Sequence, residues 1–242
     1  MKSIAISNNK GGVGKTTTAG HLAYLLSLKG KTCLIDCDSQ GSASDWYLTE
    51  DFKNELADVL SGSVSPGEAL AKLQDNFFML PTRANGNLRT YGETSINEEP
   101  FIFDDLKESL KGLGFKHIIF DLSPALGKIE RAVLTAADEV ITPITPEYFS
   151  VQGIKNFIIE LERMKRNLRL EIQHEKIVCN NVNLSITMHR DTLEGLRDVE
   201  FSVYVIPQDA EIRKAQESNQ AIFDYNPQAR CIEYYNLLAG AY

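Results

Sequence analysis

The hydrophobic positions along the chain alternate between short β-branched runs and longer segments with helical spacing. The short runs predict strands at residues 3–7, 32–36, 77–80, 117–121, 139–144, 176–182 and 202–206. The spacing between them predicts helices at residues 15–29, 103–112, 128–137, 150–168, 190–199 and 228–239, with a short pair within 52–73. We therefore expect an α/β fold in which a mostly parallel sheet is covered by helices on both faces.

Length and composition favour a single domain spanning residues 1–242. The longest irregular stretch, residues 82–100, is interpreted as a surface excursion or a flexible loop. No apolar run reaches the ~18–20 residues of a membrane span. The opening MKSIAISNN leaves no room for a signal peptide, and the four scattered cysteines fit reduced thiols. We expect a cytoplasmic protein that does not associate with membranes.

A glycine-rich segment follows the first predicted strand and opens the first predicted helix. This order of strand, turn and helix is the context of a phosphate-binding loop, in which backbone N–H groups and a helix N-terminus face an anion. Lys15 is placed to bridge the outer phosphates, and the Thr16 hydroxyl is placed to bind Mg²⁺. The expected nucleotide-binding residues here are Gly11, Gly12, Val13, Gly14, Lys15, Thr16 and Thr17.

Three aspartates stand at the ends of predicted strands, where the ligands of open α/β sheets gather. Asp36 and Asp38 end the second strand, and Asp121 ends an apolar strand. Asp121 has the position of an acid that holds Mg²⁺ through water. Taken alone, each aspartate can equally cap a turn or a helix. Combined with the phosphate loop, the three carboxylates favour a magnesium–nucleotide site.

The motifs KGGVGKTT, DCDSQG and DLSPALG resemble those of the deviant Walker ATPases, the ParA/MinD group of P-loop NTPases. The segments AADEVITPITPEYFSVQGI and VIPQDAEIRKAQESNQAIFDYNP resemble ParA, the chromosome and plasmid partitioning ATPases. The likeness runs almost from end to end of the chain. It implies a magnesium-dependent ATPase that dimerises when it binds ATP and works with a centromere-binding, ParB-like partner.

Lys10 is not explained by an ordinary phosphate loop, because it lies five residues before Lys15. The resemblance implies that Lys10 reaches across a dimer interface to the phosphates of the partner's ATP. A second cation from outside the subunit would stabilise charge that builds up during phosphoryl transfer. Its contact would exist only when two loaded subunits meet, so Lys10 would couple nucleotide state to dimerisation.

The resemblance also assigns roles to residues elsewhere. It implies that Asp38 orients or activates the attacking water, and that Asp36 and Asp121 belong to the magnesium shell. Asn180 and Pro207 fall where the family contacts adenine. The chain departs from the family at two places, because Ser39 and Ser123 replace usual prolines in switch-like loops. These departures affect the expected turnover and switching rather than the binding chemistry.

Members of the resembled family differ mainly in which surface their ATP-bound dimer binds. The C-terminal segment ARCIEYYNLLAGAY has no cationic face for a membrane, and no cysteine flanks DLSPALG for an iron–sulfur site. Basic residues indicate a DNA-binding surface. A solvated helix end is an equally good interpretation of these residues. In addition, Glu211 replaces a basic residue that the family often uses. The candidates are Arg163, Lys165, Arg166, Arg169, Arg213 and Lys214.

The net charge of −8 argues against a chain covered with DNA-binding charge but allows a local patch. Two hypotheses therefore remain. In the first, the ATPase positions DNA or other cargo by cycling on and off the nucleoid. In the second, it is a nucleotide-gated switch that positions cargo through protein contacts alone.

Overall fold

One mixed sheet organises residues 1–168, 170–197 and 199–242, which the computed structural model describes. Eight strands in this part of the chain take the order β3-β4-β2-β5-β1-β6-β7-β8. Neighbouring strands run parallel except β3 and β4, which pair antiparallel at one edge. The strands are β1 (Lys2–Ile6), β2 (Thr32–Asp36), β3 (Ala71–Lys72), β4 (Phe77–Leu80), β5 (His117–Asp121), β6 (Glu139–Ile144), β7 (Gln173–Val182) and β8 (Ser202–Pro207).

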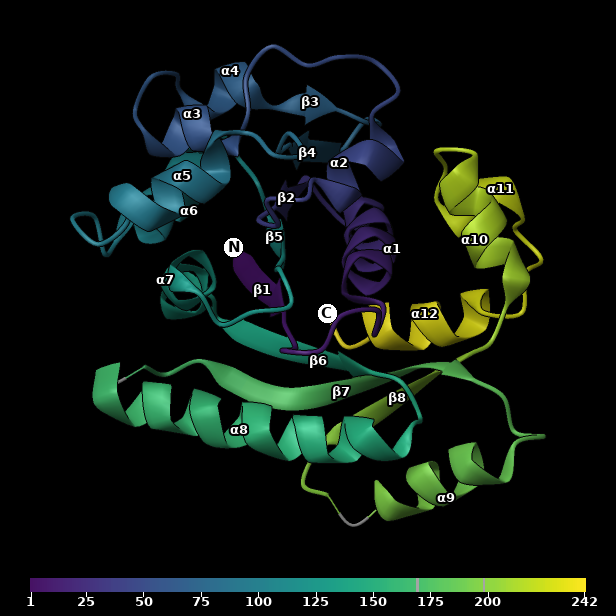
Figure 1. Cartoon of the computed structure of the whole chain (residues 1–242). Helices are drawn as coiled ribbons and strands as arrows, with labels where there is room; N and C mark the ends of the chain where they lie inside the picture. Colours follow the sequence, from purple (N-terminus) through teal and green to yellow (C-terminus); the bar gives the residue numbers. More distant parts are fainter. Residues whose placement is uncertain (169, 198) are drawn as a thin grey trace.

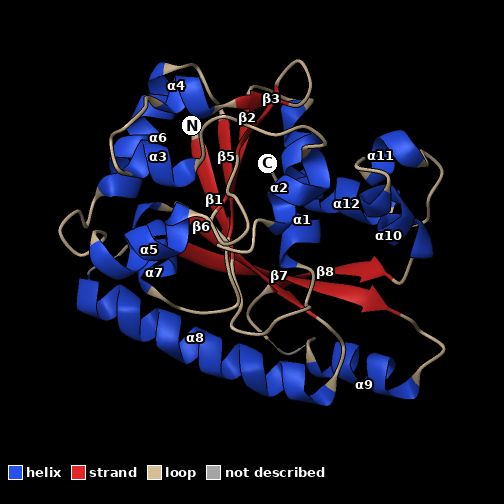
Figure 2. Ribbon diagram, turned by 45° about the horizontal axis from the view of Figure 1, so that its top comes forward, coloured by secondary structure: helices blue, strands red, loops and turns tan. Residues whose placement is uncertain are grey.

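Helices cover both faces of this sheet (Figures 1 and 2). Side chains alternate along each strand, so that Ile4 and Ile6 point to one apolar cluster and Ala5 points to the other. The first face carries α1 (Lys15–Ser27), α2 (Ser42–Tyr47), α10 (Ala210–Glu217), α11 (Ile222–Tyr225) and α12 (Ile232–Ala239). The second carries α3 (Leu56–Leu60), α4 (Pro66–Ala69), α5 (Asn87–Thr94), α6 (Ile102–Gly112), α7 (Lys128–Ala136) and α8 (Tyr148–Leu168). Beside α8 lies α9 (Thr187–Gly195).

The expected α/β architecture is confirmed, and the seven expected strands are present within a few residues of their predicted bounds. The interpretation of residues 82–100 as wholly irregular was wrong, because α5 lies within them. A buried carboxylate far away in the sequence organises this segment: Glu55 accepts hydrogen bonds from Arg83 N at 2.7 Å and Asn87 N at 3.1 Å. A local sequence pattern therefore could not reveal it.

Four further elements, α2, α10, α11 and the short strand β3, were not expected. For α10 the sequence held a signal, because the Asp209 side chain caps the helix by accepting a hydrogen bond from Glu211 N at 3.1 Å. The helix expected at 190–199 lies at Thr187–Gly195 instead. In the described part of the chain, no helix combines the length and apolar character needed to cross a bilayer.

The strand register brings three loops to one edge of the sheet. Ile6 at the end of β1 pairs with Asp121 at the end of β5, and Asp36 at the end of β2 pairs with the same aspartate. Because these strands are parallel, the chain leaves all three at the same edge. The glycine-rich segment and the loops after Asp36 and Asp121 are therefore neighbours.

Candidate nucleotide site

The loop between β1 and α1 takes the left-handed backbone conformation that glycine adopts most readily. Gly12 has φ 72° and Gly14, which stands just before α1, has φ 86°. A Cβ on Gly14 would also lie 2.7 Å from Asn180 Nδ2. Glycine is therefore required at position 14 both by conformation and by space, and the amide groups at the start of α1 remain accessible to an anion.

Lys15 lies almost buried at the start of α1, with 7% of its surface exposed. Its Nζ donates a hydrogen bond to the carbonyl oxygen of Lys10 at 2.9 Å. Burial lowers the pKa of Lys15, and the nearby carboxylates of Asp121 and Asp38 act in the opposite direction. The ammonium group is thus held between the glycine-rich loop and the two aspartates, where phosphate oxygens can replace the carbonyl as its partners.

Asp36 ties the loop after β2 together. Its Oδ2 accepts hydrogen bonds from Ser44 N and Ser44 Oγ, both at 2.8 Å, and its Oδ1 accepts one from Asp38 N at 3.2 Å. Burial raises the pKa of Asp36 to about 7. Asp38 itself is partly exposed and accepts a hydrogen bond from Gln40 N at 3.0 Å. The arrangement fixes the backbone around Asp38 and leaves most of its carboxylate available.

Asp121 is buried beside the cation of Lys15. It is 0% exposed, and neither side-chain oxygen accepts a close hydrogen bond among the described residues, while the Thr16 hydroxyl and Lys15 stand near enough to oppose a rise in its pKa. Burial and the carboxylate of Asp36 raise its pKa well above the ordinary value. The same residues contain no group of three or more His, Cys, Asp or Glu side chains that could hold a metal by itself. The site therefore fits a cation such as Mg²⁺ that takes most of its ligands from water and phosphate.

Lys10 does not turn toward Lys15 and the aspartates of its own chain. Its Nζ lies 2.7 Å from Glu147 Oε2, in the segment between β6 and α8. The backbone of Lys10 is held by Asn8, whose Oδ1 accepts a hydrogen bond from Lys10 N at 3.0 Å. Asn8 is in turn fixed by its own bond to Pro143 O at 2.7 Å. Lys10 thus stands at the outer side of the loop.

A cavity of about 210 Å³ lies on the other side of the glycine-rich loop. Asn180 and Pro207, the expected adenine contacts, both line it. The Asn180 amide group donates to Val13 O at 2.9 Å and to Thr18 Oγ1 at 3.2 Å, so its Oδ1 is the atom left to accept a bond from a base. The structure therefore brings these two residues together with the phosphate loop.

The sequence did not indicate that α10 forms a wall of this cavity. Gln216 lines it and donates to Thr17 Oγ1 at 3.1 Å, and Asp209 and Ile212 line it as well. Arg213, a candidate DNA contact, also lines the cavity and pairs with Glu217 at 3.0 Å. The capping aspartate of α10 was the local signal that could have revealed this wall.

The remaining candidates for DNA contact do not form one surface. Arg163 and Arg166 are exposed on α8, whereas Lys165 pairs with Glu162 at 2.9 Å. Lys214 on α10 pairs with Glu211 at 2.6 Å. Figures 1 and 2 show α8 and α10 on opposite sides of β7 and β8, so the two sets are separated. The remaining candidate, Arg169, lies outside the described residues.

Comparison with known proteins agrees with this arrangement. The AAA domain model AAA_31 matches residues 1–174. Protein BBD21 of Borreliella burgdorferi is 38% identical over 96% of this chain and 95% of its own length. The sporulation initiation inhibitor protein Soj of Bacillus subtilis is 29% identical over 98% of this chain and 96% of its own length. The chain belongs to the ParA/MinD-type partitioning ATPases.

A solved structure supports the assignment of this chain to the ParA/MinD-type ATPases. A plasmid partition protein from Borrelia burgdorferi B31, bound to AMPPNP, superimposes with a TM-score of 0.79 at 26% identity. The alignment covers 99% of this chain and 98% of that protein. AMPPNP, the bound molecule in that structure, is an analogue of ATP.

Proposed function

We propose that this ParA/MinD-type ATPase partitions or positions DNA, chromosomal or plasmid, through ATP-gated dimerisation and non-specific DNA binding. The observation that supports this most strongly is the placement of two lysines on one glycine-rich loop. Lys15 faces Asp38 and Asp121, whereas Lys10 faces outward to Glu147. A loop with one inward and one outward cation is suited to bind a nucleotide and to report its presence to a second subunit.

In the proposed binding mode, the triphosphate lies along the amide groups of the loop and the start of α1. Lys15 exchanges the carbonyl of Lys10 for the outer phosphates, and the adenine ring enters the cavity beside Asn180 and Pro207. Bound Mg²⁺ would neutralise phosphate charge, with Thr16 and Asp121 as its nearest protein groups and Asp36 behind them. Asp121 fits this role because its buried carboxylate lies beside Thr16 and Lys15 and close to Asp36.

For hydrolysis, Asp38 is proposed to orient the attacking water toward the terminal phosphate. Lys15 of the same subunit, together with Lys10 of the partner subunit, would stabilise the charge that develops on the phosphate oxygens. We propose slow turnover that a centromere-binding, ParB-like protein stimulates. The protein would then be cytoplasmic, associated with the nucleoid while it holds ATP, and released after hydrolysis.

DNA affinity would depend on ATP because dimerisation doubles the basic surface. A few phosphate contacts give weak, salt-sensitive binding, but two linked copies can raise avidity by ~10²–10⁴ if both reach one duplex. The test is binding of a non-specific duplex with ATP, ADP or no nucleotide at two salt concentrations. We expect binding with ATP only. It should be lost in Arg163→Glu with Arg166→Glu, a variant that still dimerises, and no binding of wild type at ~50 mM salt would exclude the DNA-based function.

A second candidate function is a nucleotide-gated switch that positions cargo through protein contacts. The charge distribution favours it, because Lys165, Arg213 and Lys214 are each paired with a glutamate of their own helix. The net charge of −8 acts in the same direction. Under this function the same assay would give ATP-dependent dimers that fail to bind DNA at either salt concentration.

A further inference from the structure

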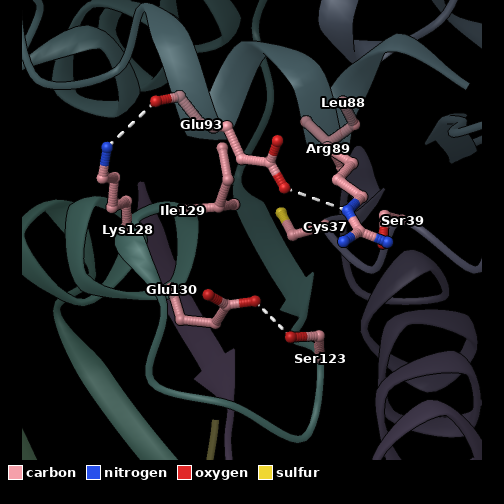
Figure 3. A pocket seen from close by; sticks show the side chains of 10 residues that line it. Cys37, Ser39, Leu88, Arg89, Glu93, Ser123, Lys128, Ile129 and Glu130 are labelled. Carbon is pink, nitrogen blue, oxygen red and sulfur yellow. Dashed lines mark hydrogen bonds and ion pairs between the residues drawn. The ribbon is translucent and has the colours of Figure 1, made fainter.

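A cavity of about 300 Å³ opens between α5 and α7, beside the loops that follow β2 and β5 (Figure 3). Cys37 and Ser39, which flank Asp38, line one side. Ser123, two residues after Asp121, lines the other, together with Glu130 from α7. The side chains that line this cavity therefore lie beside the loops after β2 and β5, which belong to the proposed hydrolysis site.

Glu130 is the charged side chain that is turned toward the loop after Asp121. It lies in the first turn of α7 and is 6% exposed. The Ser123 hydroxyl donates a hydrogen bond to Glu130 Oε1, as Figure 3 shows. Its other oxygen, Oε2, is 2.7 Å from the place where a Cβ on Gly127 would stand. Glu130 thus contacts the loop near its beginning and at its end.

The close approach at Gly127 indicates that the contact is built into the loop. Gly127 has φ −72°, which any residue can adopt, so glycine is needed there for space and not for conformation. A side chain at position 127 would push the Glu130 carboxylate away from Ser123. The present position of the Glu130 carboxylate therefore depends on the absence of a side chain at position 127.

The end of the loop is held by Arg131, whose Nε donates to Leu126 O at 2.9 Å, but this bond does not reach Ser123. Within the described residues, the Ser123 N–H donates no hydrogen bond, whereas the preceding Leu122 N donates to Ile6 O at 3.3 Å. The adjacent cavity leaves room into which the loop can move. The side-chain bond to Glu130 is a charge-assisted one, which is stronger than a bond between neutral groups. Removing the hydrogen bond between Ser123 and Glu130 should let the loop around Ser123 move between several positions.

We propose that Glu130 is a positioning residue for ATP hydrolysis, which acts by holding the loop after Asp121 through the hydroxyl of Ser123. This inference rests on the proposed ATPase function. A proline at position 123 would restrain the same loop by fixing its backbone φ angle. In this chain, which has serine there, the hydrogen bond to Glu130 takes over that restraint.

The test compares kcat and KM for Mg²⁺–ATP in wild type, Ser123→Ala, Glu130→Ala and Glu130→Gln. Both alanine variants should lose about tenfold in kcat while KM changes less than about twofold, because a displaced loop impairs the reacting geometry more than nucleotide binding. Glu130→Gln keeps a hydrogen-bond acceptor and should stay within about twofold of wild type in kcat. Thr135→Ala removes a hydroxyl that bonds to Arg131 O elsewhere on α7 and is the matched control.

Rescue separates positioning from general damage to the fold. Ser123→Pro added to Glu130→Ala should recover at least half of the lost kcat, because it restores restraint by a different means. Unchanged kcat in Ser123→Ala would overturn the inference. So would a rate loss in Glu130→Ala that is matched by loss of nucleotide affinity and is not recovered by proline. If wild type itself hydrolyses no ATP, the proposed function fails instead, and the two failures are distinguishable.

Discussion

Lys10 and Glu147 form an ion pair within one chain, with Lys10 Nζ 2.7 Å from Glu147 Oε2. Their side chains remain 35% and 55% exposed, so the pair lies at the surface of the sheet edge that carries the glycine-rich loop. Because we propose that the same ammonium group reaches the nucleotide of a second subunit, it must first leave Glu147. In the proposed mechanism the pair would therefore compete with dimerisation.

Removing the competitor should favour the dimer. We expect Glu147→Gln to dimerise in the presence of a non-hydrolysable ATP analogue at lower protein concentration than wild type. An exposed ion pair is worth at most ~1 kcal/mol, which limits the gain to about fivefold per subunit. Glu162→Gln, which removes the partner of Lys165 on α8, is the matched control. Weaker dimerisation of Glu147→Gln in sedimentation experiments would show that Glu147 supports the dimer.

Asp38 should be needed for turnover and not for binding. Its backbone is fixed by Asp36, and its carboxylate is partly exposed at the edge where the outer phosphate would lie. We expect Asp38→Ala to bind ATP and to accumulate as an ATP-bound dimer while phosphate release falls at least ~10²-fold. Asp45→Ala, on the exposed side of α2, serves as the control. Phosphate release at the wild-type rate in Asp38→Ala would remove the assigned role.

Replacing the buried carboxylate of Asp121 should raise the stability of the fold and abolish its response to magnesium. Asp121→Asn removes a buried ionisable group, which should raise the free energy of unfolding without nucleotide by ~1 kcal/mol. For a chain of this size the thermal midpoint would rise by ~2–4 °C. The same variant should lose the magnesium dependence of ATP binding. A variant that is less stable, or that keeps its full response to Mg²⁺, would contradict this account of Asp121.

Acid should destabilise the fold through His21, which is 0% exposed behind the nucleotide loop. Its Nε2 accepts a hydrogen bond from Ile222 N at 3.2 Å, so Nδ1 carries the proton and donates to Thr17 O at 2.8 Å. Burial lowers the pKa of His21 to about 3. The unfolded chain takes up a proton near pH 6.5 while the folded chain does not, so stability is lost as the pH falls below that value.

The size of this effect can be measured by urea unfolding between pH 6 and pH 4. Wild type should lose ~1.4 kcal/mol per pH unit from this group over the lower part of the range. His21→Gln should show a slope smaller by that amount, whatever its absolute stability. Equal slopes in the two proteins would mean that His21 titrates alike in the folded and unfolded states.

The elements around the nucleotide edge were predictable where the chemistry is local. The strand that ends at Asp121 contains the apolar run of residues 118–120, and the glycines before Lys15 mark the turn into α1. The helix α5 was not predictable, because Glu55, which lies far away in the sequence, holds the backbone before it. The link between Ser123 and Glu130 was equally hidden, because it depends on how α7 folds back onto the loop.

For the same reason, the strand pattern indicates that the nucleotide candidates lie close together, whereas no local pattern indicates this for the DNA candidates. Lys15, Asp36 and Asp121 are brought together by parallel strands whose ends can be located from their pattern. Arg166 and Lys214 lie on helices whose relative positions depend on packing across the sheet. Helical spacing indicates which residues share one helix, but it does not indicate which helices share one surface.

Lys10 is proposed to act on a second subunit, and sedimentation with a non-hydrolysable ATP analogue and Mg²⁺ tests this role most directly. Wild type should sediment as a dimer with the analogue and as a monomer without it. Lys10→Ala should still bind the analogue through the loop amides and Lys15, as titration would show, yet remain a monomer. A Lys10→Ala protein that dimerises like wild type would contradict the account.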